Sequence, residues 1–283
     1  MTIYTQEYRK WEGRYKKRPF KILGMILFGV KRAWSSKWTK ICLIVGWIPV
    51  LFYIVFSLIS SSFMMETFEN MRNSFFSNYF SLQELWLIFL TAVVGSSLIS
   101  EDIKNKSITL YYSSPIEKID YFLGKFGIIG TFIASITLIP STVLYWTLTL
   151  ISTGEIKSGL WLWGGCMLYS LILIVFFSML ILSLSSLTGN GKYAGASLFG
   201  LILGSGVVGG IIYEITDNPR ALLFSLSNNL SVVRDKIFRN MEQHQNILGD
   251  TLKWYHSLAV LAGVTILLWS ITYIKLSKME LSE

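Results

Sequence analysis

Six long apolar runs, separated by short polar segments, divide most of the chain. They cover residues 41–63, 82–99, 126–152, 158–187, 193–213 and 257–274. A helix needs about twenty apolar residues to cross the hydrocarbon core of a bilayer, and each run is close to that length or longer. With 283 residues, 52% of them apolar and only 15% charged, the composition agrees. The pattern predicts an all-α integral membrane protein with six transmembrane helices, in a domain covering residues 41–283.

The first 40 residues have a different pattern, basic and then amphipathic. Eleven Lys or Arg residues lie there against two Glu residues, which favours a cytosolic location next to anionic lipid headgroups. From residue 19, apolar side chains recur every three or four positions: Phe20, Leu23, Leu27, Val30 and Trp34. This spacing predicts an interfacial elbow helix that lies in the headgroup plane before the first span.

The most charged interruption between two spans is residues 99–125, which read ISEDIKNKSITLYYSSPIEKIDYFLGK and carry eight charges. So polar a segment is expected to lie in water at a bilayer surface. Residues 104–112 can form about two turns of amphipathic helix. We expect Ser113-Ser114-Pro115 to end that helix, because proline has no N–H and disfavours helix in the residue before it. An ordinary loop of an unrelated six-span protein is the alternative.

The order of residues in this segment resembles the coupling loop of export-type ABC permeases, the membrane subunits of the ABC-two exporter family. The shared features are Ser100-Glu101 with a charged run, a hydroxyl residue before Leu110, Ser113-Ser114-Pro115-Ile116 and Leu123-Gly124-Lys125. The chain departs from the family at Tyr111-Tyr112, where leucines are more usual.

The resemblance implies that the loop 100–125 docks, through a coupling helix between spans two and three, into a groove of a separate ATPase. The implied coupling residues are Glu101, Asp102, Lys104, Lys106, Ser107, Leu110, Tyr111, Tyr112, Ser113, Ser114, Pro115 and Ile116. It also implies two ATPase subunits, which bind the ATP and Mg, and a second permease subunit that is identical or homologous.

Several spans and loops carry further signals. Residues 66–81 are polar and rich in Phe and Asn, which predicts a short outer loop before span two. Pro140 in span three is expected to kink the helix and free a backbone carbonyl. In span five, small residues that include a four-residue repeat predict close helix packing, within one subunit or across a dimer. They are Gly195, Ala196, Gly200 and Gly204.

The long polar region 214–256 contains an apolar stripe at alternating three- and four-residue spacing. The stripe comprises Leu223, Leu226, Leu230, Val233 and Ile237. It predicts an extracytoplasmic amphipathic helix whose apolar side meets the membrane surface, an outer partner protein or the spans of the chain itself. In the resembled family this region often re-enters the outer leaflet and closes the exit.

The charge distribution predicts the topology. If six spans leave both termini in the cytosol, 18 Lys or Arg lie inside and seven outside, as the positive-inside rule requires. The net charge of +8 therefore reflects topology and not nucleic-acid binding. The basic arm is typical of a prokaryotic plasma membrane protein.

Other classes of function find little support. The predicted spans hold no Asp, Lys or Arg, and Glu84 lies at a span end, which argues against ion-coupled carriers. The chain has no phosphate-binding loop of its own. His244, His256, Cys42 and Cys166 form no metal or catalytic pattern, so we expect neither an enzyme nor a cofactor bound to this chain.

The sequence therefore predicts a permease subunit of an ATP-driven exporter for a hydrophobic or amphipathic substrate. The alternative is an ATP-powered mechanotransmitter that moves an extracytoplasmic partner through residues 214–256 and transports nothing small. A structural membrane protein that works without ATP is a third reading.

Overall fold

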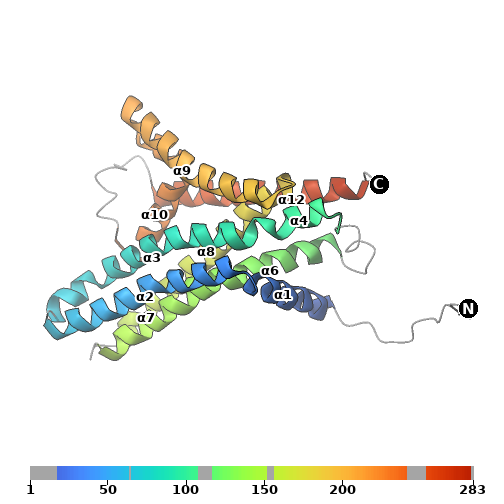
Figure 1. The fold of residues 1–283 in the computed structure, drawn as a ribbon. Coiled ribbons are helices and arrows are strands. Elements are labelled where there is room, and N and C mark those ends of the chain that lie inside the picture. Colours follow the sequence, from blue (N-terminus) through green and yellow to red (C-terminus); the bar gives the residue numbers. More distant parts are fainter. Residues whose placement is uncertain (1–17, 64, 108–116, 152–155, 241–252, 282–283) are drawn as a thin grey trace, which may run out of the picture.

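The computed structural model describes residues 18–63, 65–107, 117–151, 156–240 and 253–281, and every regular element in these ranges is helical. In chain order the elements are α1 (Arg18–Trp34), α2 (Lys37–Phe63), α3 (Met65–Gly95), α4 (Ser97–Lys104), α6 (Lys118–Ile136), α7 (Leu138–Ile151), α8 (Ile156–Leu187), α9 (Gly191–Thr216), the 3-10 helix η1 (Pro219–Phe224), α10 (Leu226–Ile237) and α12 (Trp254–Leu281) (Figure 1).

Among the described residues, six helical stretches are long and apolar enough to cross a membrane. They are Lys37–Ile59, Asn73–Lys104, Lys118–Leu150, Leu160–Leu187, Gly191–Thr216 and Trp254–Ser277. The prediction of an all-helical chain with six candidate spans is confirmed, and the fold is that expected of a multi-pass membrane protein. Two of the spans contain a break, between α3 and α4 and between α6 and α7.

Helix α8 is the centre of the bundle, since 67% of the residues in its most apolar stretch are buried. Its fully buried side chains include Tyr169, Phe176 and Phe177. Helices α9 and α12 are peripheral, with 17% and 22% buried, and α9 diverges from the other spans along its length (Figure 1). Most of their remaining surface is apolar, as expected for helices that face lipid.

The predicted outer loop at 66–81 is wrong, because helix α3 begins at Met65 and runs through that segment. The reason is an aromatic repeat at helical spacing, Phe75, Phe76, Tyr79 and Phe80, all buried. The rings of Phe75 and Tyr79 pack edge-on against the ring of Tyr53 in α2, with ring centroids 4.8 and 5.6 Å from that of Tyr53. Burial of these rings stabilises the helix. The polar residues between them made the segment look like a loop in the sequence.

Span three is interrupted where the kink was predicted. Helix α6 ends at Ile136 with Thr137 as its cap, three residues before Pro140, and α7 begins at Leu138. Proline at 140 cannot donate to the carbonyl of Ile136, and the side-chain amide of Gln83 on α3 donates to it instead, at 2.6 Å. The same amide donates to the carbonyl of Gly46, at 3.0 Å, three residues before Pro49 in α2. Gln83 therefore joins two proline-containing spans.

Helix α1 corresponds to the predicted amphipathic segment. Leu23, Leu27 and Trp34 of the predicted apolar stripe are exposed, whereas Val30 is half-buried. The opposite side of α1 packs on α6. There Gly29 faces Ile128, and a side chain on Gly29 would clash with it. Helix α1 thus carries one apolar face packed on the bundle and a second that remains exposed.

Candidate functional site

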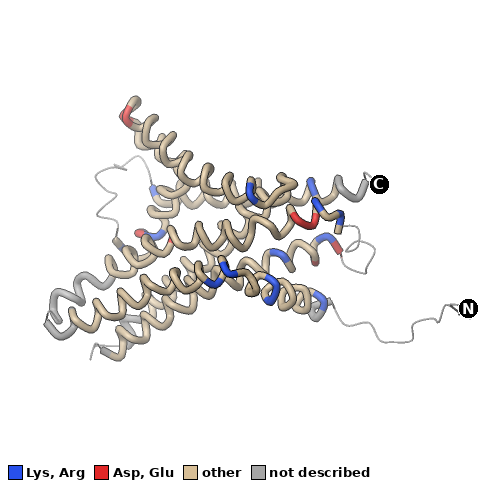
Figure 2. The backbone as a smooth tube through the Cα atoms, in the orientation of Figure 1, with Lys and Arg blue, Asp and Glu red and all other residues tan. Residues whose placement is uncertain are grey.

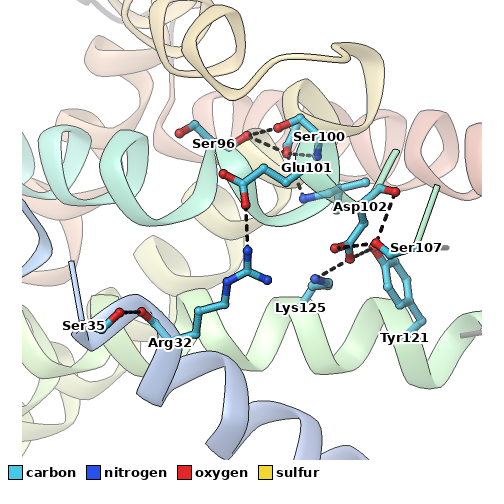
Figure 3. Close-up of polar contacts among 11 residues, drawn as sticks. Arg32, Ser35, Ser96, Ser100, Glu101, Asp102, Ser107, Tyr121 and Lys125 are labelled. Atoms are coloured by element: carbon cyan, nitrogen blue, oxygen red, sulfur yellow. Dashed lines mark hydrogen bonds and ion pairs between the residues drawn. The ribbon is translucent and has the colours of Figure 1, made fainter. Parts of the chain in front are cut away.

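The charged segment 99–125 contains a buried ion pair. Asp102 of α4 and Lys125 of α6 are each 6% exposed, and the Lys125 Nζ lies 2.7 Å from Asp102 Oδ2. The Tyr121 hydroxyl donates to the same Oδ2 at 2.8 Å, and the Ser107 hydroxyl donates to Oδ1 at 3.2 Å (Figure 3). We call these four residues the hairpin cluster. It joins α4 and α6 where they flank residues 105–117.

The end of α4 positions Asp102. The N–H of Ser107 donates to the Asp102 carbonyl at 2.9 Å, and that of Lys106 donates to the Ile103 carbonyl at 3.2 Å. Lys106 has a φ of 53°, so the three residues close the helix with a Schellman motif. The motif satisfies the last carbonyls, and the Asp102 carboxylate is then held against α6. Tyr121 and Lys125, four residues apart, lie on one face of α6.

A second contact reaches α1. Arg32 Nη2 lies 3.1 Å from Glu101 Oε2 (Figure 3). The two side chains are 64% and 46% exposed, so the pair contributes little to stability, about 0–1 kcal/mol. Its structural consequence is to place α1, α4 and α6 around one group of charges. Figure 2 shows the Lys and Arg residues of these helices near the same end of the bundle.

The break between α3 and α4 is tied to the central helix. The Ser185 hydroxyl of α8 accepts hydrogen bonds from the N–H groups of Ile99 and Ser100, at 3.1 and 3.0 Å. It donates to the carbonyl of Ser96 at 2.8 Å. One buried side chain thus makes hydrogen bonds to three backbone groups at the break. The base of the predicted coupling loop is therefore anchored to α8.

These positions correct two expectations. The segment 99–125 was expected to lie in water, yet Asp102, Asp120 and Lys125 are buried. The spans were expected to lack Asp and Lys, yet Asp102 and Lys125 lie inside candidate spans. Both errors have one cause, since the helices continue past the apolar runs and the charges within them are compensated by pairing.

The predicted coupling residues fall into three groups. Lys104 and Lys106 are exposed, Glu101 is half-exposed, and Asp102 and Ser107 belong to the hairpin cluster. Lys104 is the last residue of α4, so the predicted helix 104–112 does not begin there. The remaining predicted residues, Leu110, Tyr111, Tyr112, Ser113, Ser114, Pro115 and Ile116, lie outside the described residues.

A second buried set of charges holds α10 in the bundle. Arg234 Nη1 lies 3.1 Å from Glu84 Oε1 of α3, and Arg234 Nε lies 3.2 Å from Asp235 Oδ1. The Tyr169 hydroxyl of α8 donates to Glu84, and the Ser77 hydroxyl of α3 donates to Asp235. We call these five residues the α10 cluster. It connects α10 to both α3 and α8.

Arg234 stays protonated in this setting. Burial lowers the pKa of its guanidinium, but the neighbouring Glu84, Tyr169 and Asp235 raise it, and the net pKa lies above the ordinary arginine value. Helix α10 therefore lies close enough to the bundle for Arg234 to pair with Glu84 of α3.

The apolar stripe of region 214–256 packs on the spans of the chain itself, one of the three alternatives that the sequence left open. Leu230 and Val233 are buried, and Leu223, Leu226 and Ile237 are half-buried. Helix α10 contacts α3, α8, α9 and α12. Arg234 and Asp235 of α10 are also buried among these helices.

The small residues of α9 lie mostly on an open face. A side chain at Gly200 or Gly204 would meet nothing within 4 Å, and Ala196 is exposed. Gly195 is near Ser96 and Ala92, although 3.6 Å or more separates them from the position of an added Cβ. Packing within this chain instead buries other positions of α9: Ala194, Leu198, Ile202 and Gly209.

Sequence reasoning missed Gln83, Tyr169, Ser185 and Arg234 as site residues. Only Arg234 had a usable signal, since it stands four residues after Leu230 and three before Ile237 and so belongs to the buried stripe. The three others are common polar or aromatic residues in apolar runs. Their roles depend on partners that are distant in the sequence.

Comparison with known proteins adds no identification. No known family model matches the chain, and no curated protein matches it.

Proposed function

We propose that the chain is the permease subunit of an ATP-driven exporter, in which separate ATPase subunits bind ATP and Mg. The sequence support is the resemblance of residues 100–125 to the coupling loop of ABC-two exporters. The observation that carries the proposal is the buried ion pair of Asp102 and Lys125, which ties together the two helices that flank this loop.

A loop that receives mechanical work must not bend where it enters the membrane. The hairpin cluster joins α4 to α6, and Ser185 joins the start of α4 to α8. A displacement of residues 105–117 by an ATPase therefore moves α4 and α6 together and is passed to the central helix. Reversing a 1:99 preference between inward- and outward-open states takes about 5.5 kcal/mol, which this connection has to transmit.

In the proposed assembly, two ATPase subunits act on the loops of two permease subunits, identical or homologous, in the plasma membrane. The termini and the loop 100–125 face the cytosol, and the spans carry a hydrophobic or amphipathic substrate. The basis for the substrate class is the apolar character of the spans, several of which face outward from the bundle.

The test is purification of the tagged chain with the ATPase subunit that accompanies it, followed by ATP hydrolysis and ATP-driven flux in vesicles. Glu101→Ala and Pro115→Gly are expected to lower flux per ATP hydrolysed while membrane insertion is retained. Glu214→Ala is the matched control, because Glu214 is an exposed acid at the far end of α9 and is expected to leave flux unchanged. Unaltered coupling in both test variants, or an active preparation without any ATPase, contradicts the proposal.

A further inference from the structure

A cavity of about 330 Å³ lies where α1 meets the start of α2, beside the hairpin cluster. Its volume is at the lower end of the range for small-ligand sites, about 300–1,000 Å³. One side is polar and includes Arg32, Ser36 and Thr39, whereas Phe28 and Leu98 are among the apolar lining residues. The cavity therefore combines hydrogen-bond donors with an apolar wall.

Thr39 is the first indication of a ligand. The residue lines the cavity and is 1% exposed, and its hydroxyl has no hydrogen-bond partner among the residues that the structure describes. Most other hydroxyls in these spans donate to a carbonyl of their own helix, as Thr91 does to Leu87 at 2.6 Å. The Thr39 hydroxyl therefore has its donor and acceptor capacity available to a group bound in the cavity.

The start of α2 is the second indication. Lys40 is the first residue of this helix to donate backward, to the Ser36 carbonyl at 3.4 Å. The N–H groups of residues 37–39 precede it and have no helical acceptor. Such a helix start favours an anion. Arg32 also lines the cavity, and its guanidinium has further donors beyond the one that Glu101 accepts.

The charges around the cavity favour an anion over a cation. Two carboxylates line it, but Glu101 is paired with Arg32 and Asp102 with Lys125. The nearby exposed charged side chains on α1 and α2 are basic and include Lys31, Lys37 and Lys40. The surplus charge is positive.

Position identifies the source of the anion. The first candidate span begins at Lys37, so the start of α2 lies at the boundary of the apolar core, where lipid phosphates are found. Phe28 lines the cavity yet is 69% exposed, and Trp38 and Ile41 are also exposed. We propose that this cavity binds the phosphate group of an anionic phospholipid, with acyl chains along the exposed apolar side chains of α1 and α2. The inference does not depend on coupling to an ATPase.

The experiment measures lipid binding to the full chain, purified in an uncharged detergent, by native mass spectrometry and by the thermal unfolding midpoint. The probes are phosphatidylglycerol, diacylglycerol without a phosphate, and inorganic phosphate. We expect phosphatidylglycerol to bind with a stoichiometry of one and to raise the midpoint. Diacylglycerol and inorganic phosphate should neither bind in this way nor raise the midpoint.

Thr39→Val is the decisive variant. It should weaken phosphatidylglycerol binding about tenfold, the usual effect of losing one hydrogen bond to a charged group. The lipid-free midpoint should stay the same or rise, because the hydroxyl has no partner to lose. Thr147→Val is the matched control, since the Thr147 hydroxyl bonds within α7 to the Val143 carbonyl, and lipid affinity should not change.

Three results would overturn the inference. The first is equal phosphatidylglycerol affinity in Thr39→Val and the unaltered chain. The second is an equal rise in the midpoint with diacylglycerol, which would show an effect of acyl chains alone. The third is the same rise with inorganic phosphate, which would show that the site takes a free anion and not a lipid.

Discussion

At the scale of single residues, the two buried clusters share one local design. Asp102 and Asp235 each stand three residues before the helix cap, and each backbone carbonyl accepts an N–H across a Schellman turn, at 2.9 and 2.7 Å. The left-handed position of each turn is basic, Lys106 with a φ of 53° and Arg239 with 55°. Because the turn satisfies the backbone, the carboxylate is available for tertiary partners.

The ion pair of the hairpin cluster should be costly to break on one side. Asp102→Leu leaves Lys125 buried without this carboxylate, and we expect the free energy of unfolding to fall by about 3–5 kcal/mol. Combining Asp102→Leu with Lys125→Met removes both charges and should recover most of that loss. Chemical unfolding in detergent micelles measures both. If the free energy of unfolding of the double variant falls by the sum of the two single-variant decreases, the two charges are not energetically coupled.

Gln83 offers a second test at this scale. Gln83→Leu removes the hydrogen bonds to the carbonyls of Gly46 and Ile136. We expect the free energy of unfolding to fall by about 1–3 kcal/mol, because the Ile136 carbonyl, to which Pro140 cannot donate, loses its partner. Thr91→Val on the same helix is the control, since its hydroxyl bonds only the carbonyl of Leu87 in its own helix. A comparable decrease in the free energy of unfolding in both variants would show that the bonds of Gln83 to the other helices add no extra stability.

At the scale of elements, α10 is held by charge as well as by apolar contact. Arg234→Met removes the link to Glu84 and should release α10 from α3, since a buried Glu84 without its cation favours separation. Hydrogen exchange of residues 226–237 should become faster, whereas the central part of α8 should stay protected. Lys236→Gln, an exposed change on the same helix, is the control. Unchanged exchange in Arg234→Met would show that apolar packing alone retains α10.

The sequence was sufficient to predict the six helices and a disturbance of the helix near Pro140, because bilayer length and the missing proline N–H act locally. It failed where a helix continued through polar residues. Helix α3 starts in the predicted loop because Phe75 and Tyr79 pack on Tyr53, which is far away in the sequence. The pairing of Arg234 with Glu84, 150 residues apart, was likewise unreadable from local pattern. A charged residue considered alone is expected to face water. In the fold, such residues are buried where a partner from another helix compensates their charge.

At the scale of the whole molecule, the open face of α9 is the candidate contact between two subunits. Gly200→Leu together with Gly204→Leu should not destabilise the single chain, because nothing lies within 4 Å of either position and leucine favours helix over glycine. The double variant should lose dimers in light scattering of the purified protein. Gly210→Leu, equally open but on another side of α9, should keep them. Dimers that persist in the double variant would place the interface elsewhere.

Orientation in the membrane decides whether an ATPase can reach the loop at all. The count of 18 Lys and Arg on one side against seven on the other predicts a cytosolic location for the end where α4 finishes and α9 begins. Lys104 and Lys192 are exposed at that end, whereas Arg220 and Lys253 are exposed in η1 and before α12.

Single cysteines at these four positions, in a chain with Cys42→Ala and Cys166→Ala, report the orientation through a membrane-impermeant maleimide. Lys104→Cys and Lys192→Cys should react only in inside-out vesicles. Arg220→Cys and Lys253→Cys should react only in intact cells. The inverse pattern would place the hairpin cluster on the side without ATP. The structural tie between α4 and α6 would then remain, but the motor that it is proposed to serve could not reach it.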